Sequence, residues 1–217
     1  NLTSKTALKF LRPGFIDKRY YAIYLAETFH YTFHNSRNQA LVAARKEVMN
    51  INYMKFCLKH AAEETGHEMM ALHDLKQLLS LDITVKDLPG PLDSTKALSA
   101  YLYYIAEYEN PLARLGYSYW AERVYQYIKP MLSLLKFVGV DKKAMTFFNE
   151  HAEIDADHAK DVDLAINTYA KTEADWNAIN GAMLTSLRLT MAMVDEIMAE
   201  FIKVKDKNHE SRYRFLK

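Results

Sequence analysis

The chain has 217 residues, of which 50% are hydrophobic and 25% charged, and its formal net charge is +1. This mixed, nearly neutral charge excludes a strongly basic nucleic-acid-binding surface, and no apolar run reaches the length of a membrane span. The 6 glycines and 5 prolines are few, which is typical of long helices and excludes a β-sandwich rich in turns. We therefore expect one all-α domain over residues 1–217, a bundle of roughly six to eight helices.

The cysteine usage and the first residues indicate a compartment. The only cysteine, Cys57, cannot form a disulfide within the chain, and the opening NLTSKTALKF lacks the apolar segment of a signal peptide. Both features favour the reducing cytoplasm. The 15 tyrosines, 10 phenylalanines and 10 methionines are typical of an aromatic helical core, or of the walls of a pocket for a small-molecule partner.

Apolar periodicity and helix-breaking residues predict the helices in chain order. The expected helices span approximately residues 16–35, 36–46, 51–79, 93–108, 111–137, 141–170 and 172–204. Asn35 and Ser36 are expected to separate the first two, and Pro130 to bend the helix that contains it. Thr172 and Asp175 have the spacing of a capping box, which predicts the start of the last helix.

Two octets of the chain have the same spacing of imidazole and carboxylate side chains. The stretch HAAEETGH covers residues 60–67, and HAEIDADH covers residues 151–158. On a continuous helix, which turns about 100° per residue, the two histidines and the carboxylate of each octet fall within about 60° of one another. The two stripes consist of His60, Glu64 and His67, and of His151, Asp155 and His158. Glu63 lies at the edge of the first stripe.

Apolar neighbours indicate that both stripes face the inside of the bundle. Phe56 and Met70 continue the first stripe, and Phe147 and Val162 flank the second. Because buried imidazoles and carboxylates need partners, a divalent metal ion is the simplest group that satisfies both stripes where they meet. The alternative is that the octets lie on solvated helix faces, which leaves only a structural or partner-binding helical module.

Four further charged residues stand out. Glu122, in GYSYWAERV, stands among aromatic residues, which favours an inner role. Glu27, in YLAETFH, is either an inner acid or an ordinary helix-surface residue. Arg114 and Arg123 are candidates for binding an anionic substrate, but we expect both on the surface.

With these residues, the chain resembles the heme-oxygenase-like superfamily, in the branch of the TENA/THI-4 and PqqC proteins. Within that branch it is most similar to the heme-oxygenase-like non-heme di-iron oxidases. Their pattern is a carboxylate and a His on one core helix, a later Glu, and then His-x3-Asp-x2-His on another helix. The resemblance follows the helix order over nearly the whole chain. It implies the metal ligands Glu64, His67, Glu122, His151, Asp155 and His158.

The resemblance also implies a chemistry. In some members the first carboxylate lies at the position that His60 occupies here, so His60 is a further ligand or an outer partner, as Glu63 and Glu27 can be. The implied function is a non-heme iron oxidase or oxygenase with one or two Fe ions, or Mn, that uses dioxygen to oxidise a small organic metabolite. The alternative is a metal-free ligand-binding or thiamin-salvage-type protein of the same fold. A homodimer is compatible with this fold.

Overall fold

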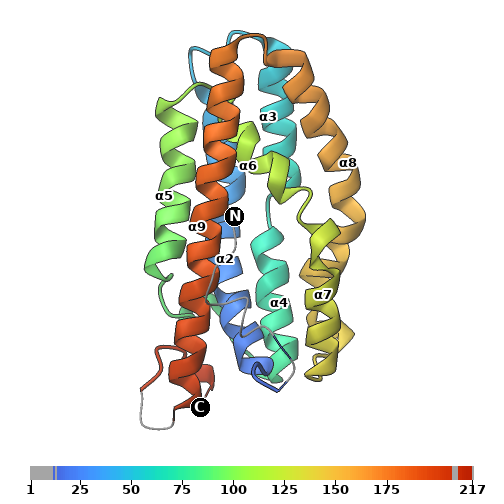
Figure 1. Ribbon diagram of the computed structural model, residues 1–217, viewed down its shortest axis with the longest axis vertical. Coiled ribbons are helices and arrows are strands. Elements are labelled where there is room, and N and C mark those ends of the chain that lie inside the picture. Colours follow the sequence, from blue (N-terminus) through green and yellow to red (C-terminus); the bar gives the residue numbers. More distant parts are fainter. Residues whose placement is uncertain (1–11, 13, 207–209, 217) are drawn as a thin grey trace.

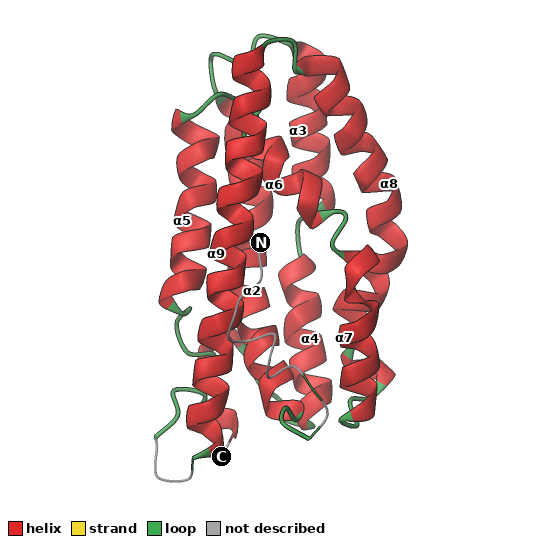
Figure 2. Ribbon diagram, viewed as in Figure 1, coloured by secondary structure: helices red, strands yellow, loops and turns green. Residues whose placement is uncertain are grey.

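The computed structural model describes residue 12, residues 14–206 and residues 210–216, and for residues 125–129 and 151–156 it describes the backbone alone. Within that part of the chain, every regular element is a helix (Figures 1 and 2), so the all-α prediction is confirmed. The α-helices are α2 (Lys18–Ala44), α3 (Ile51–Glu63), α4 (His67–Leu79), α5 (Asp93–Tyr108), α6 (Arg114–Ala121), α7 (Tyr125–Phe137), α8 (Thr146–Tyr169) and α9 (Glu173–Lys205). Short 3₁₀ turns are η1 (Val85–Asp87), η2 (Lys142–Ala144) and η3 (Arg214–Leu216).

Helix α2 is the central element of the bundle. It packs against α3, α4, α5 and α9, and much of its length is buried. Its apolar residues point in several directions: Tyr21 and Leu25 join one core cluster, whereas Tyr20 and Ile23 join another. A helix covered by neighbours on several sides needs apolar residues around its circumference and not on one stripe alone.

The expected break at Asn35 and Ser36 is wrong, because α2 continues through both residues to Ala44. The two side chains are 8% and 9% exposed, so they are buried among other helices. The side-chain amide of Asn35 donates a hydrogen bond to Glu64 Oε2 at 2.6 Å. Asn destabilises a helix interior when its side chain forms hydrogen bonds with the nearby backbone. Here the side chain of Asn35 instead forms a hydrogen bond with Glu64, a residue outside α2.

The expected continuous helix over 51–79 is also wrong, because the chain breaks between α3 and α4. Gly66 has a φ of 96°, in the left-handed region that glycine adopts at low cost. Glu64 caps the C-terminus of α3, and α4 begins at His67. The first octet is therefore divided between two helices, whereas the second lies within α8.

The break predicts the effect of substituting Gly66. Gly66→Ala should lower the free energy of unfolding by about 1–2 kcal/mol, the cost of a left-handed conformation for a residue with a Cβ atom. Urea denaturation would measure it. The Cβ itself would meet no atom within 4 Å, so backbone conformation is the only expected cause. Gly181→Ala is the matched control: it also lies in open space, but inside α9, where alanine should stabilise the helix.

The expected helix over 111–137 divides as well, into α6 and α7, and Glu122 caps the C-terminus of α6. Pro130 lies inside α7, as expected. The predicted capping box is confirmed: Thr172 Oγ1 accepts from the Asp175 N–H at 3.1 Å, and Asp175 Oδ2 accepts from the Thr172 N–H at 2.9 Å.

Two helix N-termini are capped by carboxylates from other helices. Asp74 of α4 accepts hydrogen bonds from the backbone N–H groups of Thr146 and Phe147, both at 2.9 Å, at the start of α8. Glu27 of α2 accepts one from the Leu92 N–H at 2.9 Å, at the start of α5. Such bonds satisfy N–H groups that a helix cannot pair internally, and they join the helices into one bundle. Among the described helices, none has the length and hydropathy of a membrane span.

Candidate metal centre

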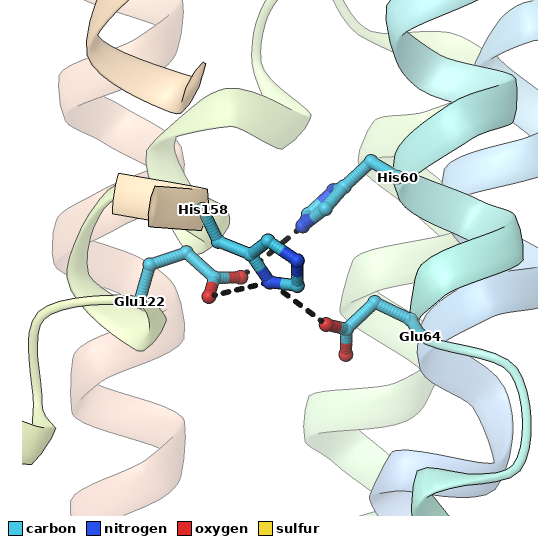
Figure 3. Close-up of side chains that lie close together, drawn as sticks. All are labelled: His60, Glu64, Glu122 and His158. Carbon is cyan, nitrogen blue, oxygen red and sulfur yellow. Dashed lines mark hydrogen bonds and ion pairs between the residues drawn. The ribbon is translucent and has the colours of Figure 1, made fainter. Parts of the chain in front are cut away.

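Four side chains from three helical segments converge inside the bundle (Figure 3). They are His60 on α3, Glu64 at its C-cap, Glu122 at the C-cap of α6, and His158 on α8. Each contributes one ligand atom to a set in which all atoms lie within 4.8 Å of one another. The four residues are between 4% and 9% exposed, so the cluster is almost completely withdrawn from water.

Glu122 and His158 hold the cluster together. His60 Nε2 lies 3.2 Å from Glu122 Oε1, and His158 Nδ1 lies 3.5 Å from Glu122 Oε2. The same nitrogen, His158 Nδ1, also lies 3.8 Å from Glu64 Oε1 (Figure 3). At the rim, Glu63 Oε2 lies 3.6 Å from His158 Nε2. Glu63 thus contacts the ring nitrogen of His158 that does not face Glu122 and Glu64. Carboxylates often orient metal-binding histidines through that second nitrogen.

These contacts shift the protonation of the cluster. The contact with Glu122 is the main reason why the pKa of His158 rises to about 9. Burial raises the pKa of Glu122, but the interactions with His158 and His60 outweigh burial and hold the pKa below its ordinary value. The contact with Glu64 raises the pKa of His67. Without a metal, the His158 proton therefore balances part of the carboxylate charge at neutral pH.

Both glutamates of the cluster lie at helix C-termini, where the local potential is negative. Glu64 caps α3 and Glu122 caps α6. The last carbonyl groups of a helix carry a partial negative charge, which disfavours a carboxylate and favours a cation. The two buried carboxylates and the two helix C-termini therefore add up to a negative potential, which a bound metal cation would compensate.

The chemistry of the donor set fits a divalent first-row metal. Two imidazoles and two carboxylates form the mixed nitrogen and oxygen set that iron and manganese accept. His158 Nδ1, which lies toward Glu122 and Glu64, is buried and makes no hydrogen bond of ordinary geometry with a described residue, so it is available to bind an ion. Because two ligands of one ion lie up to about 4 Å apart, small side-chain rotations would complete the set.

The structure brings three of the six predicted ligands into this cluster: Glu64, Glu122 and His158. His67 lies beside it, with Nδ1 3.5 Å from Glu64 Oε2. The predicted stripe placed His67 on the same continuous helix as His60, and the break at Gly66 removes that relation.

The other predicted residues have different outcomes. His151 and Asp155 belong to α8, but their side chains lie outside the described part of the structure, so their roles stay predictions. His60 joins the cluster, and Glu63 lies at its edge. Glu27 lies in none of these contacts: its carboxylate accepts from Thr95 Oγ1 at 2.6 Å, from the Tyr213 hydroxyl at 2.9 Å and from the Leu92 N–H. We therefore assign Glu27 a structural role.

The surface position expected for Arg114 is wrong, since this residue is 1% exposed. Its guanidinium donates to Asn38 Oδ1 at 2.6 Å, to Ser118 Oγ at 2.8 Å and to Asn35 Oδ1. Asn35 in turn contacts Glu64, so Arg114 belongs to the surroundings of the cluster. The one sequence signal of this role is the pair Asn35 and Asn38, because residues three apart share a face when a helix runs through both.

A small opening reaches the cluster between α3 and α8. It has a volume of about 10 Å³, which is room for about one water molecule, and His60 and His158 are among its lining residues. Lys59 bridges the opening, with Nζ 2.8 Å from Asp161 Oδ2 and 3.5 Å from Glu63 Oε1. Exposed ion pairs of this kind contribute little to stability.

Comparison with known proteins agrees with the site. Residues 22–191, which include all four residues of the cluster, match the family model of the iron-containing redox enzymes. A crystal structure from Shewanella denitrificans OS217, described as a domain of unknown function with a heme oxygenase-like fold, is 38% identical with a TM-score of 0.88. The alignment covers 97% of this chain and 91% of that one. A comparison with curated proteins gives no match. The chain therefore belongs to the family of iron-containing redox enzymes and has the heme-oxygenase-like fold.

Proposed function

We propose that the protein is an iron-dependent oxidase or oxygenase that oxidises a small organic metabolite with dioxygen. The observation that supports this most directly is the buried cluster of two histidines and two glutamates in a member of an iron-containing redox family. His60, Glu64, Glu122 and His158 would hold one ion. His67, His151 and Asp155 are the candidates for completing a di-iron centre. Bound iron would supply the one-electron chemistry with dioxygen that side chains alone cannot perform.

Glu122 and two tyrosines near the cluster determine how its side chains are oriented and where protons are held. Glu122 contacts both histidines and so fixes their rings relative to each other. Burial raises the pKa of Tyr31 and of Tyr117, and Glu64 adds to both shifts. Both phenols therefore remain neutral hydrogen-bond donors even at alkaline pH, near a carboxylate of the cluster.

Anaerobic titration with Fe(II) tests the proposal. The protein should bind one or two equivalents, and mixing with oxygen should then change its absorption spectrum. Titration with Mn(II) would show whether that metal competes. Failure to take up iron under these conditions would refute the proposal and favour a metal-free ligand-binding protein of the same fold.

The raised pKa of His158 predicts a pH dependence of metal binding. Because the pKa is about 9, His158 carries a proton at pH 7, and a metal ion has to displace it. The affinity for Fe(II) or Co(II) should therefore rise by about tenfold per pH unit up to about pH 9 and then level off. Competition with a chelator of known pH dependence would measure it, and an affinity independent of pH between 6 and 9 would contradict the prediction.

A further inference from the structure

Arg114 places a positive charge inside the bundle at an unfavourable position. It is the first residue of α6 and is 1% exposed. Burial penalises the charge and lowers the pKa of the guanidinium, and the helix N-terminus adds a partial positive charge of its own. Its hydrogen bonds go to neutral oxygen atoms of Asn35, Asn38 and Ser118. Such a residue needs a compensating negative charge nearby, and the cluster supplies it.

Asn35 connects Arg114 to Glu64 in a fixed direction. Its Oδ1 accepts from the guanidinium, and its Nδ2 donates to Glu64 Oε2 at 2.6 Å. Because a guanidinium only donates and a carboxylate only accepts, the amide of Asn35 has one orientation that satisfies both. Glu64 Oε2 is thereby engaged, while Oε1 faces His158 Nδ1 at 3.8 Å. The connection decides which oxygen of Glu64 is presented to the cluster.

A second connection runs along α6 to Glu122. Arg114 donates to Ser118 Oγ, and the Glu122 N–H donates to the Ser118 carbonyl oxygen at 3.0 Å. The guanidinium carbon also lies 4.5 Å from the centre of the Tyr117 ring, which holds the side chain against its own helix. Both Glu64 and Glu122 act electrostatically on the guanidinium, so its charge lies within reach of both carboxylates of the cluster.

We infer that Arg114 is a positioning residue of the metal centre: with Asn35 it fixes Glu64 as a single-oxygen ligand, and its permanent charge favours a divalent over a trivalent ion. The first part follows from the fixed orientation of the amide. The second follows because a nearby cation repels an ion in proportion to that ion's charge. The inference rests on the proposed function, since it requires that the cluster binds a metal.

Three variants of the full-length protein separate the two parts. Arg114→Met removes charge and hydrogen bonds, Arg114→Lys retains the charge, and Asn35→Leu retains the charge but breaks the connection to Glu64. Co(II) serves as the probe, with its affinity measured by chelator competition and its ligand geometry by the visible spectrum. Asn35→Leu should lower the Co(II) affinity by roughly 10- to 100-fold and alter the spectrum. Arg114→Met should alter the spectrum in the same way but lose less affinity, because it also removes a charge that repels the ion.

The reduction potential of the iron-loaded proteins tests the charge. It should fall in Arg114→Met, because loss of a cation makes the trivalent ion more stable, and stay near the wild-type value in Arg114→Lys and Asn35→Leu. Should Arg114→Met fail to fold, the Co(II) spectra of the other two variants decide the positioning role. Their potentials then decide the charge, since a fall in either would contradict it.

Arg45→Met is the matched control for loss of a partly buried arginine. Arg45 caps the C-terminus of α2 and donates to the carbonyl oxygens of Ala106 and Glu109. Its replacement should affect stability without affecting the Co(II) spectrum. If the wild-type protein binds neither Co(II) nor Fe(II), the proposed function fails. If the wild-type protein binds metal and all Arg114 and Asn35 variants match it in affinity, spectrum and potential, only the present inference is overturned.

Discussion

Replacing His158 with alanine should abolish iron binding and, with it, any absorption change on mixing with oxygen. His158 is the residue of the cluster that contacts most carboxylates: Nδ1 lies near Glu122 and Glu64, and Nε2 near Glu63. Its removal leaves Glu122 and Glu64 without the imidazole that stands between them. The loss of affinity should reach at least about 100-fold, the upper range for residues that only support a ligand. Anaerobic Fe(II) titration followed by stopped-flow absorption would measure both effects.

His73→Ala is the control for this experiment, because His73 is an exposed residue of α4. It should bind iron as the wild-type protein does. Equal iron binding by His158→Ala and His73→Ala would show that iron binds elsewhere, whereas loss in both would point to a nonspecific effect of removing a histidine.

The sequence predicted the helical architecture well and the helix ends less well. Capping and breaking residues have local effects, so Thr172, Asp175 and the loop before α5 were predictable from the chain alone. Asn35 was predicted as a break because its side chain usually competes with the backbone. Its partner Glu64 belongs to another helix, and no local pattern reveals such a partner. Gly66 is ambiguous in sequence, since a glycine within a helical pattern can continue the helix or end it.

The candidate site was predictable in part for a similar reason. Repetition of the octet singled out Glu64 and His158, and the aromatic surroundings singled out Glu122. On one uninterrupted helix His60 and His67 would share a face, whereas the structure brings only His60 into the cluster. The burial of Arg114 depends on how α2 and α6 meet, which periodicity does not reveal.

The structure of a single chain does not test the remaining expectations. The extent of a single domain over residues 1–217, the cytoplasmic location, the small-molecule substrate and the homodimer stay predictions. So do the number of iron ions and the use of dioxygen, which the titration described above addresses.

Glu122→Gln should lower the free energy of unfolding of the metal-free protein by up to about 3 kcal/mol near pH 6. The reason is the raised pKa of His158, from 6.5 to about 9, whose largest cause is Glu122, and each pKa unit corresponds to about 1.4 kcal/mol. Glutamine has nearly the same shape but no charge, so the histidinium loses its main partner. Urea denaturation of chelator-treated protein, repeated from pH 4 to pH 10, would measure the difference.

The sign of each pKa shift sets the pH range of this effect. A raised pKa means that the folded protein binds the His158 proton more tightly, so this stabilisation is complete below pH 6.5 and is lost as pH rises through about 9. The pKa of Glu122 is lowered, so its contribution is present above the ordinary value of 4.5 and is lost at lower pH. The difference between wild type and Glu122→Gln should therefore be largest between about pH 5 and pH 6.5.

Glu63→Gln is the matched control, because Glu63 also contacts His158, at 3.6 Å, but its side chain is 36% exposed. Water screens that contact, so the loss of stability should be clearly smaller and flatter with pH. Equal losses in the two variants would contradict the dominant role of Glu122. A second distinction comes from adding the same excess of Fe(II) to each protein. A ligand that binds only the folded state raises stability with the logarithm of its affinity. Wild type and Glu63→Gln should gain stability with iron, whereas Glu122→Gln should gain much less, because it lacks both the ion pair and the carboxylate ligand.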